Sequence, residues 1–315
     1  MAGLTPSMVV QVGELELPNP VMTAAGTAGY ADELASFVDL ARLGAVVVKS
    51  QSPRPWPGNP GPRVHETPAG MINSVGLQGP GVKAWIEEQL PALLATGVER
   101  VVASIWGHAA DEFGEAAELM AGAPPEVVAV EVNLSCPNRQ NQDKMFGQSP
   151  DATCEVLAAT AVAGRPRWAK LTYQVTDLTE IAAAAVEGGA SALTLINTLP
   201  AMVIDTETRR PRLGAGRGGL SGPAIRPLAV RAIYDCRAVF PDLPIVGVGG
   251  VATGADAAEL MLAGANAVQV GTAGFADPRA VESVLDGLEQ WCRGHGVVDV
   301  GELSGGAHGG QRSER

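Results

Sequence analysis

The chain has 315 residues, 46% of them hydrophobic, which is enough apolar material to bury a large core. Its formal net charge of -12 argues against nucleic acid or an anionic membrane surface as a partner and favours a small molecule or another protein. No N-terminal stretch has the composition of a targeting signal, and no apolar run is long enough to cross a bilayer, so we expect a cytoplasmic protein. The four cysteines lack CxxC spacing, so the sequence indicates neither a zinc site nor an iron–sulfur cluster on this chain.

The first predicted element is a strand pair over residues 8–17, hinged at Gly13, which we expect to close the bottom of a barrel. After it, short apolar runs typical of buried parallel strands alternate with helical segments. The strands are expected at residues 21–24, 45–48, 101–105, 127–132, 168–171, 192–196, 245–248 and 267–270. The helices are expected at residues 32–42, 109–120, 151–163, 178–187, 255–262 and 281–291. About eight strands in this alternation predict an α/β fold, a single TIM (β/α)8 barrel domain over residues 1–303.

Two connections, residues 50–81 and 197–222, are much longer than ordinary barrel loops and are rich in glycine, proline and arginine. Long loops at the C-terminal face of a barrel normally build its site, so we expect both to border a ligand. The tail, residues 304–315, has no core-forming residues and is expected to be disordered.

The segment EVNLSCPN, residues 131–138, places polar side chains at the C-terminal end of a predicted strand. Asn133, Ser135, Cys136 and Asn138 offer donors, acceptors and one group that can exchange a proton. No histidine lies in a strand-end motif, so acid–base chemistry at a carbon atom would fall to Cys136. The alternative is that Cys136 is a small buried hydrophobic residue, which is the usual state of a free cysteine.

Two lysines end predicted strands, Lys49 after AVVV and Lys170 after RWA. A lysine at such a position is costly to desolvate unless an anionic or electron-rich group meets it, so both should face a ligand. Asn73, and Asn197 with Thr198, add neutral hydrogen-bonding groups from the two long loops. A loop asparagine often serves only the turn in which it lies.

Glycine-rich turns follow the last two predicted strands, GVGGV at residues 247–251 and VGTA at residues 270–273. Glycine lets backbone N–H groups approach an anion closely, and a following helix adds a favourable dipole. In a TIM barrel these two strand ends commonly bind phosphate, which is what we expect here. The alternative is that both are only tight strand-to-helix turns.

A collinear series of motifs over nearly the whole barrel resembles class 1 dihydroorotate dehydrogenases. The motifs are NPVMTAAGT (19–27), VVVKS (46–50), ETPAGMINSVGLQGPG (66–81), EVNLSCPN (131–138), AKL (169–171), LINT (195–198), GGLSGPAIRPLAV (218–230), PIVGVGGV (244–251) and AVQVGTA (267–273). The set is highly specific, although no single member is.

The resemblance implies an FMN-dependent enzyme, with one FMN per chain, that oxidises (S)-dihydroorotate to orotate in pyrimidine biosynthesis. In the family, the cysteine of the SCPN motif, here Cys136, is the general base, and hydride passes to flavin N5. By motif position the resemblance assigns substrate binding to Lys49, Asn73, Leu77, Asn133, Asn138, Asn197 and Thr198. It assigns FMN binding to Ala24, Gly26, Lys49, Ser50, Asn133, Lys170, Ile196, Gly222, Gly249, Gly250, Gly271 and Thr272. Lys170 would stabilise the charge of the reduced flavin.

The loop motifs resemble the catalytic subunit of the NAD-linked (type B) form more than the fumarate-using homodimers. The resemblance to the family implies a homodimer. The resemblance to the type B form also implies a partner subunit that carries FAD and a [2Fe–2S] cluster. Three residues depart from the family pattern: Gly79 stands where asparagine is usual, Tyr173 where proline is frequent, and Trp106 where a small residue is usual. They leave open a related dihydropyrimidine as substrate. From the residues alone, a flavin-free lyase or isomerase of a phosphorylated metabolite and a non-catalytic barrel also remain alternatives.

Overall fold

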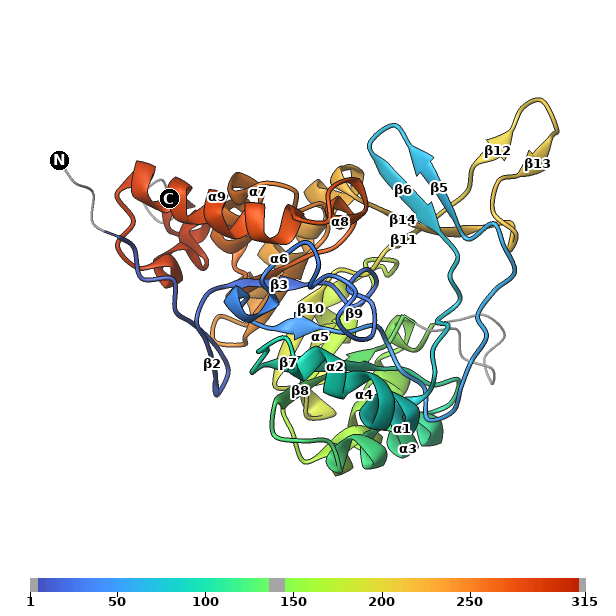
Figure 1. The fold of residues 1–315 in the computed structure, drawn as a ribbon. Coiled ribbons are helices and arrows are strands. Elements are labelled where there is room, and N and C mark those ends of the chain that lie inside the picture. Colours follow the sequence, from blue (N-terminus) through green and yellow to red (C-terminus); the bar gives the residue numbers. More distant parts are fainter. Residues whose placement is uncertain (1–4, 136–144, 312–315) are drawn as a thin grey trace.

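A computed structural model describes residues 5–135 and 145–311 of the chain. Within these residues eight parallel strands follow one another around a barrel in the order β3-β16-β15-β10-β9-β8-β7-β4 (Figure 1). The strands are β3 (Val21–Thr23), β4 (Val46–Val47), β7 (Val101–Ile105), β8 (Val127–Asn133), β9 (Arg167–Leu171), β10 (Ala192–Leu195), β15 (Ile245–Val248) and β16 (Ala267–Val270). A parallel bridge between Met22 and Ala45 joins the two ends of this order, so the barrel is closed. The predicted TIM barrel is confirmed, with a strand at each predicted position.

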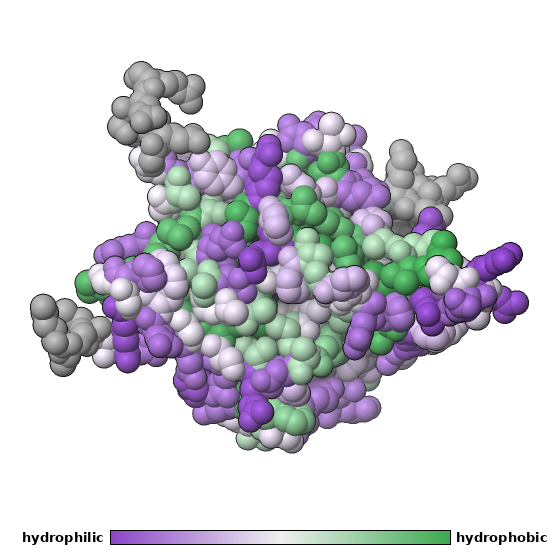
Figure 2. All heavy atoms as spheres, turned by 90° about the horizontal axis from the view of Figure 1, so that it is seen from above, coloured by the Kyte–Doolittle hydropathy of each residue, from purple (hydrophilic) through white to green (hydrophobic). Residues whose placement is uncertain are grey.

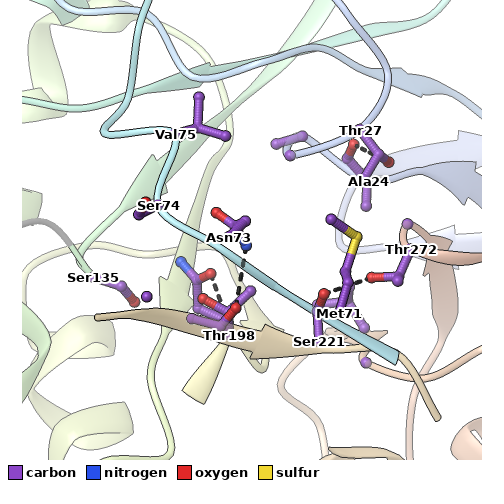
Figure 3. Close-up of a pocket in the computed structure, with 18 of the residues that line it drawn as sticks. Ala24, Thr27, Met71, Asn73, Ser74, Val75, Ser135, Thr198, Ser221 and Thr272 are labelled. Atoms are coloured by element: carbon purple, nitrogen blue, oxygen red, sulfur yellow. Dashed lines mark hydrogen bonds between the residues drawn. The ribbon is translucent and has the colours of Figure 1, made fainter. Parts of the chain in front are cut away.

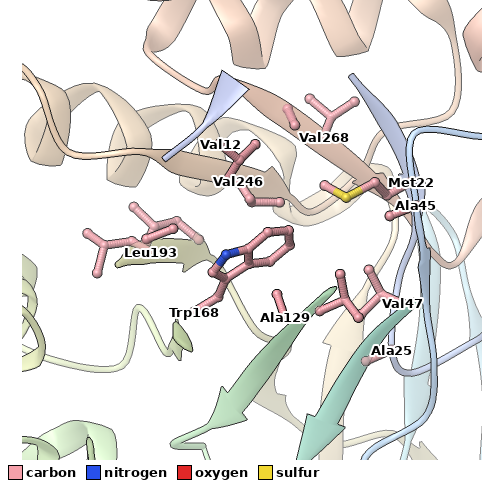
Figure 4. Close-up of a cluster of buried hydrophobic side chains, with 14 of the residues drawn as sticks. Val12, Met22, Ala25, Ala45, Val47, Ala129, Trp168, Leu193, Val246 and Val268 are labelled. Carbon is pink, nitrogen blue, oxygen red and sulfur yellow. The ribbon is translucent and has the colours of Figure 1, made fainter. Parts of the chain in front are cut away.

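The barrel strands form because they are short, β-branched or apolar, and buried on both faces. Figure 4 shows the indole of Trp168 inside the barrel, among Ala129, Val246 and Val268. Trp168 is fully buried, and truncating such a ring to alanine typically costs about 3–5 kcal/mol. Because these apolar side chains fill the interior, the barrel is a packed core, and a ligand can bind only at an end of it.

The predicted N-terminal hairpin is present as strands β1 (Val10–Val12) and β2 (Leu15–Leu17), which pair antiparallel. Gly13 forms the turn with a φ of +65°, a conformation that glycine adopts without strain. Val12 lies beside Val246 in the barrel interior (Figure 4). The hairpin therefore closes the N-terminal end of the barrel, as expected.

The helices surround the barrel (Figure 1). Those of ten or more residues are α3 (Ala110–Ala121), α4 (Pro150–Ala159), α5 (Leu178–Glu187), α6 (Arg226–Val239), α7 (Gly254–Ala263) and α9 (Ala280–His295). The shorter ones are α1 (Val82–Ala84), α2 (Leu90–Leu94) and α8 (Ala273–Ala276), with a π-helix at Trp85–Gln89 between α1 and α2. Short 3-10 helices lie at Leu40–Arg42, Phe146–Gln148, Thr160–Ala163, Pro223–Ile225, Val300–Leu303 and Gly306–Gln311.

The helix expected at residues 32–42 is wrong except for its last turn, the 3-10 helix Leu40–Arg42. The carboxylate of Glu33 accepts hydrogen bonds from the backbone N–H groups of Tyr30 and Ala31, at 3.1 and 2.7 Å, and so stabilises a turn there. Sequence analysis also did not predict α6, whose second residue is Pro227. Proline is tolerated in the first turn of a helix, because the N–H group that it lacks would have no partner there.

Residues 304–311 differ from the disordered tail that the sequence predicted. Residues 306–311 form a 3-10 helix. The ring of His308 stacks on Tyr234 with 3.9 Å between ring centroids, and its Nε2 lies 3.0 Å from the carbonyl oxygen of Ala263. The segment contributes little apolar surface, but it packs on the C-terminal end of α7 and satisfies carbonyl groups there. Residues 312–315 lie outside the described residues.

The two long loops combine into a sheet of their own beyond the barrel. Strands β5 (Val64–Thr67), β6 (Gly70–Asn73), β11 (Leu199–Ala201) and β14 (Gly218–Ser221) pair antiparallel in the order β11-β14-β6-β5. A second hairpin, β12 (Ile204–Asp205) with β13 (Arg210–Pro211), projects farther outward (Figure 1). Helix α9 lies at the opposite side of the molecule from this long-loop sheet (Figure 1).

The outer surface mixes hydrophilic and apolar side chains, with hydrophilic ones along much of its outline (Figure 2). Phe275 of α8 is among the large apolar side chains that stay exposed, with 61% of its surface accessible. Among the helices of the described residues, none combines the length and apolar composition needed to span a membrane.

Candidate functional site

A cavity of about 600 Å³ opens between the C-terminal ends of the barrel strands and the long-loop sheet. Its wall combines residues that directly follow barrel strands with residues of both long loops (Figure 3). Every described residue that the sequence assigned to substrate or FMN lines this one cavity. These residues are Ala24, Gly26, Lys49, Ser50, Asn73, Leu77, Asn133, Lys170, Ile196, Asn197, Thr198, Gly222, Gly249, Gly250, Gly271 and Thr272.

One side of the cavity is built from glycines. Gly249 and Gly250 follow β15, and Gly271 follows β16. A side chain at Gly250 would be strained at its φ of +75°, and its Cβ would lie 2.6 Å from the Cβ of Arg226. Within the described residues, the backbone N–H groups of Gly249, Gly250 and Gly271 make no hydrogen bond. These bare amides fit an anionic group such as a phosphate.

The N-terminus of α7, which the sequence placed beside this anion site, is already capped by its own chain. Thr253 and Asp256 form a capping box, and the Asp256 carboxylate also accepts from the N–H group of Ala252 at 3.0 Å. The same carboxylate pairs with Arg226. The glycine amides, rather than the dipole of α7, are therefore the groups available to an anion.

A chain of hydrogen bonds links the ends of four barrel strands across the cavity floor. The hydroxyls of Ser50 and Ser104 lie 2.8 Å apart, and Asn133 Nδ2 lies 3.5 Å from Ser50 Oγ. Asn197 donates through Nδ2 to Asn133 Oδ1 at 3.1 Å and accepts from the N–H group of Thr198 at 2.8 Å. These hydrogen bonds fix the orientation of the side-chain amides of Asn133 and Asn197, so the two amides offer a rigid pattern of donors and acceptors to a planar polar ring.

The long-loop sheet supplies the opposite wall. Asn73, at the end of β6, donates to the carbonyl oxygen of Gly219 at 3.3 Å and faces Thr198 (Figure 3). A Cβ at Gly219 would lie 2.1 Å from Thr198 Oγ1, so only glycine permits this approach. Leu77 lines the same wall with a φ of +58°, a strained conformation for a residue that is not glycine.

The two lysines lie at the cavity in different electrostatic surroundings. Lys170 is 6% exposed and pairs with the fully buried Glu131, with 3.1 Å between Nζ and Oε1. Lys49 is half-buried, and none of the ion pairs among the described residues involves it. Burial lowers the pKa of Lys49, and the neighbouring Arg63 lowers it further. Lys49 is therefore a cation that an anionic ligand would stabilise.

Two hydroxyls that sequence analysis did not assign to a ligand also face the cavity. The Oγ atoms of Ser74 and Ser135 are buried and, among the described residues, have no hydrogen-bond partner (Figure 3). A buried hydroxyl without a partner is costly, so both fit a polar ligand. Sequence analysis named Ser135 among the polar groups of the EVNLSCPN segment, whereas the only signal for Ser74 was its position next to Asn73.

Cys136 and Asn138 lie outside the described residues. Ser135, which directly precedes Cys136, lines the cavity. The assignments made to these two residues therefore remain predictions.

The three residues that depart from the family pattern do not line the cavity. Trp106 is fully buried and packs edge-on against Trp56, with ring centroids 6.0 Å apart. Gly79 pairs with Trp56 through two backbone hydrogen bonds of 2.8 and 2.9 Å, and Tyr173 packs against the hydrophobic core. These changes support the loops around the site and do not form its wall.

Comparison with known proteins gives a consistent result over nearly the whole chain. The family model for dihydroorotate dehydrogenase matches residues 7–291. The chain is 46% identical over 301 residues to the dihydroorotate dehydrogenase B (NAD(+)) catalytic subunit of Geotalea uraniireducens, covering 95% of this chain and 98% of that protein. It is 49% identical to the protein of the same name from Desulforudis audaxviator (95% and 97% covered) and 45% identical to that from Trichlorobacter lovleyi (97% and 100% covered).

Proposed function

The chain belongs to the dihydroorotate dehydrogenase family, and from this premise we propose that it catalyses the FMN-dependent oxidation of (S)-dihydroorotate to orotate in pyrimidine biosynthesis. The observation that carries the proposal is that one cavity combines a phosphate cradle of bare glycine amides with a rigid cluster of asparagines. A phosphate-bearing cofactor and a planar amide ring need these two surroundings side by side.

The cradle and the strand ends beside it would hold FMN. Gly249, Gly250, Gly271 and Thr272 are available to the phosphate, and Thr272 Oγ1 is itself positioned by a 2.8 Å hydrogen bond to Ser221 Oγ (Figure 3). Bound FMN supplies the hydride acceptor of the reaction. Lys170, which lines the cavity, would supply a fixed cation to stabilise negative charge on the reduced cofactor.

The asparagine cluster would hold the substrate. Asn133 and Asn197, whose side-chain amides are hydrogen-bonded to each other, would offer fixed donors and acceptors to the ring amides, and Asn73 would approach from the long-loop sheet. Leu77, which lines the same cavity, would cover the ring with apolar surface. Lys49, a half-buried cation without an ion-pair partner among the described residues, fits the carboxylate of dihydroorotate. This cation favours dihydroorotate over a related dihydropyrimidine that lacks the carboxylate.

Proton removal is assigned to Cys136. Its thiolate would take the proton from the ring carbon next to the carbonyl, and the resulting thiol would return the proton to solvent in a later step. The role of Cys136 rests on its position in the SCPN motif, directly after the cavity-lining Ser135.

The relatives named above are catalytic subunits, and we extend this to the chain: it works with a partner subunit that carries FAD and a [2Fe–2S] cluster and passes electrons to NAD+. We also expect two copies of the chain to form a homodimer.

The decisive experiment adds dihydroorotate anaerobically to the purified chain and follows flavin absorbance at about 450 nm. We expect a yellow protein that bleaches and that does not then reduce NAD+ until the partner subunit is added. Light scattering on the same sample reports whether the chain is dimeric. A colourless protein would support a flavin-free lyase or isomerase instead. A yellow protein that stays yellow would leave a flavoprotein that acts on another substrate.

Two variants test the base in the same assay. Cys136→Ala should slow flavin reduction by about 100-fold or more, because it removes the general base. Cys136→Ser should keep a small rate that rises at alkaline pH, as a hydroxyl is a weaker acid than a thiol. Cys154→Ala, at a half-buried cysteine of α4, is the matched control and should reduce its flavin at the wild-type rate. A Cys136→Ala rate equal to wild type at every pH would remove Cys136 from the mechanism without touching the flavoprotein assignment.

A further inference from the structure

Three buried polar side chains meet inside the barrel directly below the cavity. Glu131 of β8 and Gln269 of β16 are fully buried, and Lys170 of β9 is 6% exposed. Lys170 Nζ donates to Glu131 Oε1 at 3.1 Å and to Gln269 Oε1 at 3.4 Å. Gln269 Nε2 donates to Glu131 Oε2 at 2.8 Å. The three side chains therefore close a ring of hydrogen bonds, which we call the Lys170 triad.

The Lys170 triad fixes the direction of each of its groups. The amide of Gln269 must turn its nitrogen to the carboxylate and its oxygen to the ammonium group, because the reverse orientation would place like partners together. An ammonium group has three N–H donors, and the triad uses two of them. Of the three members, Lys170 alone lines the cavity, so its remaining donor is the one available to a ligand.

Stability alone does not explain the triad. The layer below it is apolar and contains Trp168, Ala129 and Val246. Replacing a buried ion pair by apolar side chains of similar volume is often neutral or stabilising, so a barrel that needed only to be filled would not require these charges. Glu131 and Gln269 do not line the cavity, but both accept a hydrogen bond from Lys170, which does. Any effect of these two residues on a ligand must therefore act through Lys170.

We propose that Glu131 and Gln269 are positioning residues for Lys170. Gln269 and Glu131 hold its ammonium group at the cavity wall, and the Glu131 carboxylate offsets part of its positive charge, so together they set the reduction potential of the bound flavin. The inference rests on the proposed function, since it takes FMN to be the ligand beside Lys170. Beyond that function, the inference gives Glu131 and Gln269 the role of adjusting the charge and position of the Lys170 ammonium group.

The first test measures the midpoint potential of the bound flavin in Glu131→Gln. This substitution keeps the size of the side chain and an oxygen acceptor for Lys170 but removes the negative charge. The less compensated ammonium group should stabilise the reduced flavin, so the potential should rise. We expect about a tenfold change in the equilibrium constant of reduction, which is about 30 mV for a two-electron couple. Glu112→Gln is the matched control: its carboxylate caps the N–H group of His108 outside the cavity, and its potential should equal that of wild type.

The second test measures Gln269→Met alone and combined with Lys170→Met. Without the amide, the ammonium group loses one of its two acceptors and is less well held at the cavity wall, so the potential should fall, in the opposite direction to Glu131→Gln. In the Lys170→Met background the same substitution should have no further effect, because its action passes through the lysine. This cycle keeps the proposal testable even if Glu131→Gln fails to fold, which thermal unfolding of each variant would reveal.

The outcomes separate the inference from the proposed function. If wild type binds FMN and bleaches with dihydroorotate, but Glu131→Gln and Gln269→Met keep the wild-type potential, the inference is wrong and the function stands. An equal shift from Gln269→Met with and without Lys170 would also overturn it. If purified wild type retains no FMN, both the function and the inference fall.

Discussion

Lys49 and Lys170 illustrate how one residue type takes two roles in a single cavity. Lys170 has its charge compensated inside the barrel by Glu131. Lys49 follows β4, and burial and the nearby Arg63 lower its pKa. A buried cation with a lowered pKa regains stability when an anion binds beside it, so ligand binding at Lys49 should be linked to protonation.

This linkage gives a pH prediction at the scale of one residue. The pKa of Lys49 is lowered from its ordinary value of 10.5, so the lysine should lose its charge at a pH below 10.5. The affinity for orotate should therefore fall as the pH rises through the lowered pKa of Lys49. Lys49→Met should weaken orotate binding by about tenfold near neutral pH, or about 1.4 kcal/mol, and flatten this part of the profile. Lys49→Arg, which keeps its charge, should move the fall to higher pH. Calorimetric titration with orotate from neutral to alkaline pH checks all three proteins, and a Lys49→Met profile that overlays wild type would refute the assignment.

At the scale of elements, the side chain of Arg63 makes several of the hydrogen bonds that hold the first long loop together. Arg63 donates to the carbonyl oxygens of Asn59 at 2.6 Å and Pro57 at 2.9 Å, and to the side chain of Gln78. The backbone carbonyl of Gln78 also accepts from the hydroxyl of Tyr30. Burial, and then the charge of Glu33, raises the pKa of Tyr30 to about 12, so this hydroxyl stays a donor at physiological pH.

The position of Leu77 depends on the hydrogen bonds of Arg63. Leu77 has a strained backbone conformation, and Arg63 holds the side chain of its neighbour Gln78. Arg63→Met should therefore raise the KM for dihydroorotate several-fold with a smaller change in FMN retention. It should lower the free energy of unfolding by about 1.5–3 kcal/mol, the usual contribution of hydrogen bonds from a charged group. Steady-state kinetics and urea unfolding measure the two effects.

Arg54→Met is the control for that prediction. Arg54 belongs to the same loop, but its side chain is 67% exposed and pairs with Glu115 on the surface. Such surface pairs contribute little, so both its KM and its stability should match wild type. If Arg63→Met behaved like Arg54→Met, the loop would be held in place by something other than the arginine.

At the scale of the whole molecule, the closed barrel and the helices around it place titratable groups in apolar surroundings. Cys236 of α6 is fully buried. Burial, with smaller effects of Asp235 and Asp177, raises the pKa of its thiol from 9.0 to about 12. The unfolded chain therefore releases this proton at lower pH than the folded chain does. The stability that the neutral thiol contributes is complete below pH 9 and is lost progressively between pH 9 and 12.

Cys236→Ala should remove this loss. At neutral pH the variant should be about 1 kcal/mol less stable than wild type because it leaves a small cavity. Near pH ~10.5 wild type should have lost about 2 kcal/mol through the thiol, so the order of stability should reverse. Urea unfolding at several pH values, with saturating FMN in every sample, measures the difference. Parallel curves for the two proteins over the alkaline range would contradict this prediction, and Cys154→Ala serves as the comparison at a half-buried cysteine.

The barrel and most of the cavity wall could be predicted from the order of the amino acids. Apolar β-branched runs are local patterns, and eight of them separated by helical segments leave few folds other than a closed parallel barrel. Residues at or just after the C-terminal ends of such strands must then gather at one end of the barrel, which is why Lys49, Asn133, Lys170 and Gly271 could be assigned together. The family motifs extended this to the loop residues Asn73 and Asn197.

Features that depend on contacts between distant residues became visible only in the folded chain. Glu131 lies within the EVNLSCPN motif, but its role depends on Lys170, 39 residues away, and on Gln269, 138 residues away, and no local pattern relates these positions. The long-loop sheet pairs Asn73 with Gly219, which lies in the other long loop. The tail at 304–311 and the turn at Glu33 were mispredicted for the same physical reason. Hydrophobic periodicity records which faces are buried, whereas hydrogen bonds between remote segments decide which polar groups are satisfied, and those bonds exist only once the chain has folded.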